Sequence, residues 1–450
     1  MVALPEAVPA GRRQGRLLRV LGVAFGLAII IGNSIGVGIL RTPGDIAARL
    51  PSEPLFLGVW IAGGIYALLG ALSLAELGAM IPRSGGQYVF VRRALGEYPG
   101  FVVGWSDWIS TCGSTAAVSI VLGEYSGVLF PALAGRETAT AVAAVLAFAG
   151  IQWRGIKWGD SVQQITSLAK TLGFGALILA CFLLVGAHGP SVPVPTPAGA
   201  ALFAAVTVSL QGVIYTYDGW NGIFYFSEEV RDPGRDIVRS TIVGVLMVIT
   251  IYLLVNLAFL HVLSIGGMAG EPFVAGTAAK AIFGLRGDTV IRGLMVVSIL
   301  STINALQLMA SRIPLAMSRD RLLPARVATV SEGGAPRVAL LAGTAVAVLL
   351  LLTGTFNQVL ALLAFYFVLN YLLSFTSIFV LRLREPDTER PYRVWGFPWT
   401  TGIALLGSVG FLIANVAGDT RNSVRSIAIL ALSFPVFLLV QRAIRAKAAR

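Results

Sequence analysis

The sequence predicts an all-α integral membrane protein of about twelve transmembrane helices. We expect two inverted repeats of five spans, with spans 1 and 6 broken and two helices appended. Three observations predict this fold: the composition, the spacing of long apolar stretches and two glycine clusters. Of 450 residues, 56% are hydrophobic and 12% charged, whereas a soluble domain is roughly 45–50% apolar and 25% charged. This composition excludes a soluble enzyme, a disordered chain and a secreted disulfide scaffold.

A helix needs roughly 20 mostly apolar residues to cross the hydrocarbon layer of a bilayer. The expected spans lie at 18–40, 55–80, 99–128, 138–152, 160–186, 200–227, 237–263, 290–315, 337–353, 357–381, 399–417 and 424–441. The fourth and the ninth are the shortest. The resulting division is an N-terminal tail (1–17), a first five-helix repeat (18–186), a second (200–381), two appended helices (399–441) and a C-terminal tail (442–450).

The basic residues predict the orientation of the chain. With the N-terminus inside, the inner segments hold 25 of the 34 Lys and Arg, the outer segments hold eight, and Lys170 lies inside a span. Cytoplasmic loops carry such an excess, so both termini are expected in the cytoplasm. The net charge of +12 therefore reports topology and is no argument for nucleic acid binding.

Two connections differ from the short loops. Residues 187–199 form a Pro-rich spacer, and 264–285 are too polar to span but too apolar for a solvated linker. We expect short helices over an extracellular vestibule in the second segment.

Two spans carry glycine clusters where a membrane helix would be continuous, at 31–39 and at 215–222. Unwound backbone is tolerated in a membrane only where it lines a cavity or meets a ligand. The half-helix beginning near Gly36 would present free N–H groups, which suit a carboxylate. The half-helix ending near Tyr215 to Tyr217 would present carbonyls, which suit an ammonium. The pair predicts a pocket for the head of an α-amino acid; the alternative is that these glycines serve close helix packing.

Several motifs then resemble a known family, the amino acid–polyamine–organocation (APC) superfamily, and within it the L-type amino acid transporter (LAT) branch. The similarity follows the whole chain and is strongest in spans 1, 2 and 6, in the motifs Gly36-Val37-Gly38-Ile39, Ala75-Glu76-Leu77-Gly78, Pro82-Arg83-Ser84-Gly85-Gly86-Gln87-Tyr88, Tyr217-Asp218-Gly219-Trp220-Asn221 and Glu228-Glu229-Val230-Arg231-Asp232-Pro233. The resemblance implies a leucine-transporter-type fold with substrate held between the breaks of spans 1 and 6.

The resemblance also implies roles for single residues. The substrate carboxylate would meet N–H groups at Gly36, Val37 and Gly38, and the amine would meet carbonyls at Tyr215, Thr216 and Asp218, with Tyr215 closing over the substrate. Val37 departs from the serine usual in the family, so a hydroxyl contact is lost there. The expected substrate-binding residues are Ile35, Gly36, Val37, Gly38, Ile39, Tyr215, Thr216, Tyr217, Asp218, Gly219 and Trp220.

Animal members of the LAT branch pair with a heavy chain through a cysteine between spans 3 and 4. Residues 130–138 contain no cysteine, and both cysteines, Cys112 and Cys181, lie in apolar stretches. We therefore expect no disulfide-linked heavy chain but a stand-alone permease of bacterial type in the cytoplasmic membrane. Its expected partners are an amino acid and the lipid bilayer.

Four of the ionisable residues inside expected spans suggest a role. A lysine inside a membrane span, such as Lys170, indicates a functional role. The resemblance implies that Lys170 takes the place of a sodium ion bound by sodium-coupled relatives. The alternative is a lysine whose side chain extends to the membrane interface. Asp107 is read as a structural partner of a base or as a coupling residue, and Lys170 and Asp107 are the expected coupling pair. Asp218 could meet a cationic substrate, the amine or a helix end. Glu76 is expected to tether the loop of Arg83.

The favoured function is sodium-independent secondary transport of L-amino acids, with neutral substrates expected, by alternating access as an exchanger or proton symporter. One alternative is a permease for cationic amino acids or amines recognised through Asp218; others are a non-transporting amino-acid sensor and a channel. No metal site, cofactor or enzymatic activity is expected, because His188 and His261 lie far apart and the sequence lacks HExxH, GxSxG and P-loop patterns.

Overall fold

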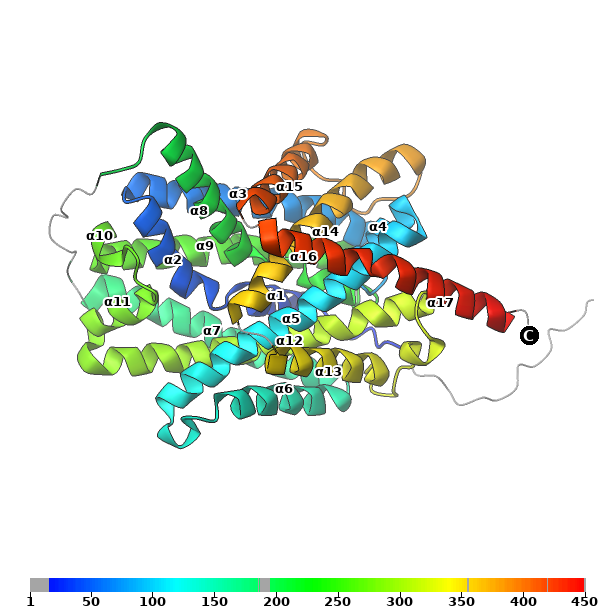
Figure 1. Cartoon of the computed structure of the whole chain (residues 1–450), viewed down its shortest axis with the longest axis horizontal. Helices are drawn as coiled ribbons and strands as arrows, with labels where there is room; N and C mark the ends of the chain where they lie inside the picture. The colour runs from blue at the N-terminus through cyan, green and yellow to red at the C-terminus, as the bar shows by residue number, and fades with distance from the viewer. Residues whose placement is uncertain (1–15, 185, 187–194, 354–355, 419, 449–450) are drawn as a thin grey trace, which may run out of the picture.

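The computed structural model describes residues 16–184, 186, 195–353, 356–418 and 420–448. Within these ranges the chain is helical, and its β-type pairing is a single isolated bridge between Leu21 and Val230. Figure 1 shows most helices lying side by side along the long axis of the molecule. The arrangement is that of a helical bundle whose helices cross one apolar layer, as expected.

The helices follow the expected spans in order. The first repeat contains α1 (Val23–Ser34), α2 (Gly38–Arg49), α3 (Glu53–Met80), α4 (Gln87–Leu95), α5 (Glu97–Leu129), η1 (Pro131–Leu133), α6 (Glu137–Trp153) and α7 (Ile156–Leu184). The second contains α8 (Gly199–Tyr217), η2 (Gly222–Phe226), η3 (Pro233–Ile237), α9 (Val238–Val262), α10 (Ile265–Met268), α11 (Val274–Phe283), η4 (Gly284–Arg286), α12 (Gly287–Arg319), η5 (Ala325–Ala328), α13 (Arg337–Thr353) and α14 (Phe356–Arg384). The appended helices are α15 (Trp399–Gly418), α16 (Thr420–Ala431) and α17 (Ser433–Ala448).

Fewer of the described helices are long enough to span a membrane than the sequence pattern predicts. Among the described residues, nine helices are long and apolar enough to cross a membrane, and the bent pair of α1 and α2 makes ten. The two shortest expected spans, α6 and α13, are apolar helices of 17 residues each. Twelve spans therefore remain a prediction that depends on these two helices.

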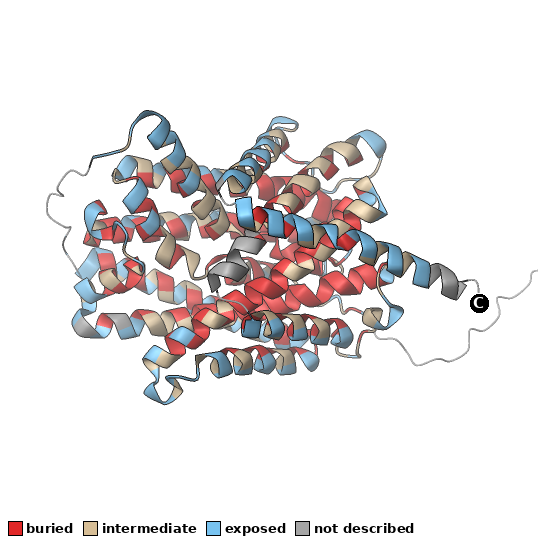
Figure 2. Cartoon of the chain, in the orientation of Figure 1, coloured by how far each residue is buried: buried red, intermediate tan, exposed pale blue. Residues whose placement is uncertain are grey.

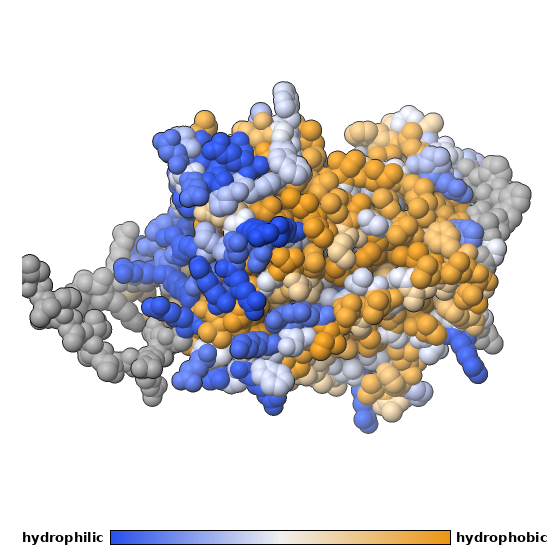
Figure 3. Space-filling model, turned by 180° about the vertical axis from the view of Figure 1, so that it is seen from behind, coloured by the Kyte–Doolittle hydropathy of each residue, from blue (hydrophilic) through white to orange (hydrophobic). Residues whose placement is uncertain are grey.

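The loops gather at two opposite ends. Residues 16–20 and the end of α17 lie at one end, called here the tail end, and α10 and α11 lie at the other (Figure 1). Leu21 pairs with Val230 and the backbone N–H of Ile156 donates to Gly333 at the tail end. Figure 3 shows hydrophilic residues concentrated there, beside an apolar surface over most of the rest of that face. The structure therefore brings together the basic segments that the sequence assigns to one side.

The centre of the bundle is buried, as the inner turns of α5 and α12 in Figure 2 show. These two helices of 33 residues each pack against one another through the middle of the molecule. Their central turns carry buried polar side chains, among them Ser106, Asp107, Ser301 and Asn304. Polar groups buried in a membrane protein mark a functional interior.

The segment 264–285 forms the expected short helices, α10 and α11, which pack against α2. The N–H of Gly270 donates to the carbonyl of Gly44 at 3.0 Å. The Pro-rich spacer at 187–199 lies mostly outside the described residues, as does most of the tail 1–17, and α17 continues through 442–448.

The expected tether between Glu76 and the Arg83 loop is wrong. Glu76 accepts two hydrogen bonds from Arg382, at 3.0 and 2.5 Å, and one from the backbone N–H of Val394. Arg83 instead pairs with Asp320 at 2.8 Å. Glu76 is 1% exposed, and its charge is balanced by Arg382 at the end of α14 and by Arg390 and Val394 of the loop after α14, not by the Arg83 loop.

Candidate functional site

The first span is broken as predicted. α1 ends at Ser34 and α2 begins at Gly38, with a bend of 43° between them. Cβ atoms at Gly36 and Gly38 would meet Thr302 at 3.9 Å and Thr216 at 3.0 Å, respectively. The first backbone N–H groups of α2 have no carbonyl of a preceding helical turn to which they can donate, as at any helix N-terminus.

The carbonyls that the break exposes are met by a lysine. Nζ of Lys170 donates to the carbonyls of Gly32 at 2.9 Å and Ile35 at 2.5 Å, and lies 3.3 Å from Oγ1 of Thr302. Ser298 also donates to Ile35 at 3.0 Å. Lys170 is 0% exposed, so the alternative of a side chain that extends to the membrane interface is wrong: the ammonium points into the bundle, and its three donors face three oxygens.

The second break differs in form from the first. α8 ends at Tyr217, a turn follows in which Gly219 adopts φ +115°, and the chain continues as the five-residue 3-10 helix η2. A positive φ favours glycine, which explains its place in this turn. The expected second half-helix is therefore a short 3-10 segment.

Side chains tie the two breaks to each other. The hydroxyl of Tyr252 lies 2.6 Å from the carbonyl of Ser34 and 2.9 Å from that of Thr216. Nδ2 of Asn33 donates to the carbonyl of Gly219 at 3.4 Å. The carbonyl of Thr216, which the family resemblance assigns to a substrate amine, thus already has one hydrogen-bond donor, although a carbonyl can accept two.

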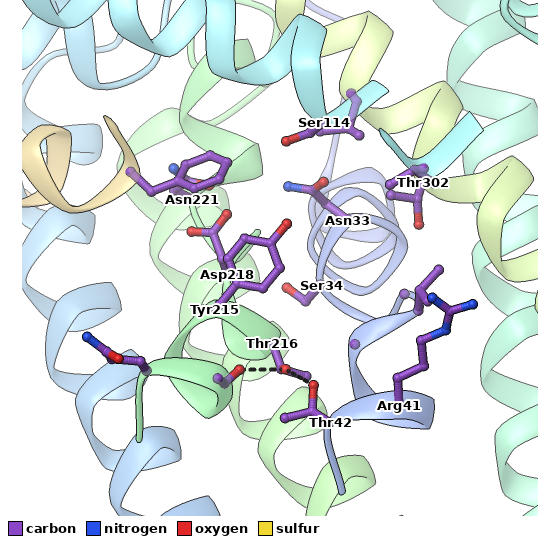
Figure 4. A pocket seen from close by; sticks show the side chains of 18 of the residues that line it. Asn33, Ser34, Arg41, Thr42, Ser114, Tyr215, Thr216, Asp218, Asn221 and Thr302 are labelled. Carbon is purple, nitrogen blue, oxygen red and sulfur yellow. Dashed lines mark hydrogen bonds between the residues drawn. The ribbon is translucent and has the colours of Figure 1, made fainter. Parts of the chain in front are cut away.

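A cavity of about 630 Å³ lies between the breaks, within the usual range for small-molecule sites. It runs from Asp107 and Tyr225 along α2 to Asp45 and Arg49. Figure 4 shows the side chains of Ser34, Tyr215, Asp218 and Asn221 around this space. One cavity therefore joins both predicted breaks.

Six of the eleven expected substrate-binding residues line the cavity: Gly36, Val37, Gly38, Tyr215, Thr216 and Asp218. The coupling candidate Asp107 also lines it. The other five, Ile35, Ile39, Tyr217, Gly219 and Trp220, and also Lys170, are buried behind the wall. Tyr217 packs against Trp60 and Tyr252, and Trp220 stacks on Tyr371 with ring centroids 5.1 Å apart.

The sequence indicates that spans 3, 8 (at 301–304) and 10 contribute to the opposite wall, but not which of their side chains face the cavity. That wall includes Thr111, Ser114 and Val118 of α5 and Thr302, Leu306 and Met309 of α12. Thr111 and Ser114 follow Asp107 at helical spacings of four and seven, so they share its face. That spacing was the available signal for the α5 residues.

Two of the three carboxylates that line the cavity, Asp107 and Asp218, are held by tyrosines. The hydroxyl of Tyr225 lies 2.9 Å from each carboxylate oxygen of Asp107, and Tyr371 donates to Asp218. Asp107 therefore pairs with a phenol and not with a base, contrary to its expected structural pairing. Tyr371 stacks between Trp220 and Phe375, which fixes its ring.

The cavity is closed toward the tail end by ion pairs. Glu229 accepts from Arg312 at 3.0 and 3.1 Å, and these side chains are 0% and 3% exposed. Asp320 at the end of α12 meets Arg83 at 2.8 Å and Arg92 at 3.3 Å. Among the described residues, no group of three or more His, Cys, Asp or Glu is placed to hold a metal ion.

Comparisons with known proteins agree with this geometry. Residues 21–440 match the family model described as amino acid permease. The chain is 28% identical to the serine/threonine exchanger SteT of Bacillus subtilis, over 94% of this chain and 96% of that protein. It is 27% identical to the b(0,+)-type amino acid transporter 1 of Mus musculus, over 84% and 79% of the two chains. The large neutral amino acids transporter small subunit 2 of Mus musculus is 28% identical over 87% and 75%.

Proposed function

Because the chain belongs to the amino acid permease family, with its leucine-transporter-type fold, we propose that it carries L-amino acids across the membrane by alternating access without sodium. The observation that carries this proposal is the position of Lys170. Its ammonium lies among two carbonyls and a hydroxyl, the oxygen ligands that a hard cation prefers in proteins. A fixed or protonatable charge there occupies the space that a coupling ion needs.

Recognition of the main chain follows from the two breaks. Gly36, Val37 and Gly38 line the cavity at the start of α2, and the free N–H groups of a helix N-terminus suit a carboxylate. The end of α8 at Tyr215 to Tyr217 offers carbonyls to the ammonium. Leu306, Met309 and Phe367 line the same cavity and suit the uncharged side chain of a neutral substrate. Exchange is the favoured coupling because a relative is named a serine/threonine exchanger.

The same reasoning extends to membrane orientation and partners. We propose that the tail end faces the cytoplasm of a bacterial cell, because the basic segments gather there. We also propose that the permease acts without a disulfide-linked heavy chain, since both cysteines are buried and unbridged.

Uptake into proteoliposomes tests the proposal. Labelled serine and leucine should enter equally well with external sodium or choline, and faster when the vesicles contain unlabelled amino acid. Lys170→Ala should insert normally but transport at least about tenfold more slowly, since a charged hydrogen-bonding network of this kind is worth roughly 1.5–3 kcal/mol per bond.

Two results would contradict the proposal. Uptake that requires sodium would contradict the role proposed for Lys170. Transport by Lys170→Ala at the wild-type rate would contradict it as well. Binding of amino acids without any flux would instead identify a sensor.

A further inference from the structure

Asp107 and Asp218, two of the three carboxylates that line the cavity, have no cationic partner within the described part of the chain. Asp107 is 3% exposed, and its hydrogen-bond donor is the hydroxyl of Tyr225. Asp218 accepts from Tyr371. An ionised carboxylate has about four acceptor positions, so one phenol leaves most of them available on each.

The neighbouring cations are directed elsewhere, including Arg49 of the cavity lining, which donates to the carbonyl of Asp45 at 3.0 Å. The ammonium of Lys170 donates to the carbonyls of Gly32 and Ile35 and to the hydroxyl of Thr302, so none of its acceptors is a carboxylate. Arg41 lines the cavity, but its guanidinium donates to Tyr125 at 3.2 Å. A charge buried in a membrane protein is costly unless it is paired. The inner half of the cavity therefore has a deficit of positive charge that a ligand can supply.

Other groups around the cavity are also suited to a ligand. Ser34 is 5% exposed, lines the cavity and has no hydrogen-bond partner for its Oγ among the described residues. Figure 4 shows this hydroxyl directed toward the cavity. Oγ1 of Thr111 donates to the carbonyl of Asp107 at 2.7 Å, which leaves its lone pairs to accept a hydrogen bond. Thr111 lies on α5 with Asp107, whereas Ser34 ends α1 at the first break.

The remaining wall suits a long side chain. Leu306 and Met309 line the cavity with Asp107, so apolar surface lies beside the carboxylate. A lysine or arginine side chain combines these needs, because its methylene stem buries on apolar surface while its charged head keeps polar partners. The volume of about 630 Å³ accommodates such a molecule.

We propose that Asp107, oriented by Tyr225, binds the positively charged end of a substrate side chain, so that the permease carries cationic L-amino acids as well as neutral ones. This inference rests on the proposed function, since the main-chain site must hold the same substrate. Asp107 then determines specificity, while the breaks supply the common binding of ammonium and carboxylate.

Asp107→Asn tests the inference because it keeps the size of the side chain and removes its charge. Uptake of labelled lysine and serine into proteoliposomes gives kcat/KM for each. The lysine-to-serine ratio should fall at least about tenfold, the usual effect of losing a charge-assisted contact. Glu332→Gln, which removes the charge of an exposed acid away from the cavity, should leave the ratio unchanged.

A second variant and a binding measurement keep the test decisive if Asp107→Asn folds poorly. Tyr225→Phe retains the carboxylate but removes its donor, and it should lower the same ratio by a smaller factor. Lysine should raise the melting temperature of the wild-type protein, as a ligand of the folded state does, and raise that of either variant less.

The contrary outcomes are distinct. Wild-type protein that carries serine but not lysine would overturn this inference and leave the proposed function intact. An equal loss of lysine and serine transport in Asp107→Asn, with loss of proton dependence, would assign Asp107 to coupling. Absence of any amino acid flux in the wild type would overturn the proposed function itself.

Discussion

At the scale of single residues, the glycines of the first span have two different roles. A Cβ at Gly32 would lie 1.9 Å from Nε2 of Gln163 and 2.7 Å from Oγ of Ser167. A Cβ at Gly36 would have its nearest neighbour, Thr302, at 3.9 Å. The two interpretations of this cluster, close packing and an open break, therefore both hold, but for different glycines.

Alanine substitutions separate these roles. Gly32→Ala should sharply reduce the amount of folded protein, since it forces α1 away from the hydrogen-bonded polar side chains of α7. Gly36→Ala should fold, but its methyl group should raise the KM for amino acids several-fold by narrowing the cavity. Size-exclusion profiles of the purified variants, followed by uptake kinetics, measure both. A folded Gly32→Ala with normal transport would contradict the packing role.

The sequence predicted residues that belong to the broken backbone better than those that belong to the walls. Gly36 and Asp218 could be identified because a glycine cluster or an acid inside a span is unusual in a membrane helix. Thr302 and Leu306 resemble ordinary residues of a buried helix. Their position depends on how α12 is rotated about its axis, which one sequence does not specify without its packing partners.

At the scale of elements, α12 holds the closed end of the cavity. Its last turns carry Arg312, Arg319 and Asp320, which pair with residues of the loop after η2 or of the 83–92 segment. The guanidinium of Arg312 also lies 5.0 Å from the ring centroid of Phe226. The pair of Arg312 with Glu229 is the most buried of these contacts, so removing one of its partners should cost the closed end more stability than breaking any of the others.

Removing one partner of this pair should be more harmful than removing both. Arg312→Gln should destabilise the protein by about 3–5 kcal/mol, because it leaves Glu229 as a buried unpaired charge. The double variant Glu229→Gln, Arg312→Gln should lose less than the two single variants together. Thermal unfolding in detergent measures the three. Additive losses would show that the two side chains act independently.

Most elements follow from the sequence to within a few residues, since apolar length decides where a membrane helix begins and ends, but α2 runs to Arg49, past the expected end at 40, and α17 runs to Ala448, past 441. Other exceptions occur where side-chain contacts decide. Span 6 continues as the 3-10 helix η2, around Tyr225, which reaches Asp107. Glu76 turns to Arg382 and Arg390, partners more than 300 positions away in the sequence, and no local pattern identifies such partners.

At the scale of the whole molecule, the two ends of the cavity differ. Toward α10 and α11, its lining includes Asp45, which is exposed. Toward the tail end, the ion pairs of α12 and the buried Tyr225 close it. The structure therefore has one accessible end and one closed end, the asymmetry that alternating access requires.

Cysteine labelling measures this asymmetry and the orientation of the chain together. In a background without the two buried native cysteines, Asp45→Cys should react with a membrane-impermeant maleimide added to whole cells, and substrate should slow the reaction. Ser84→Cys, at a position 4% exposed near the tail end, should resist the reagent from that side. It should react in inverted vesicles only when substrate shifts the protein to its inward-facing conformation. Opening the tail end must separate α12 from Arg83 and Glu229. Reaction of Ser84→Cys in whole cells would reverse the proposed orientation, and reaction at both ends without substrate would describe a channel.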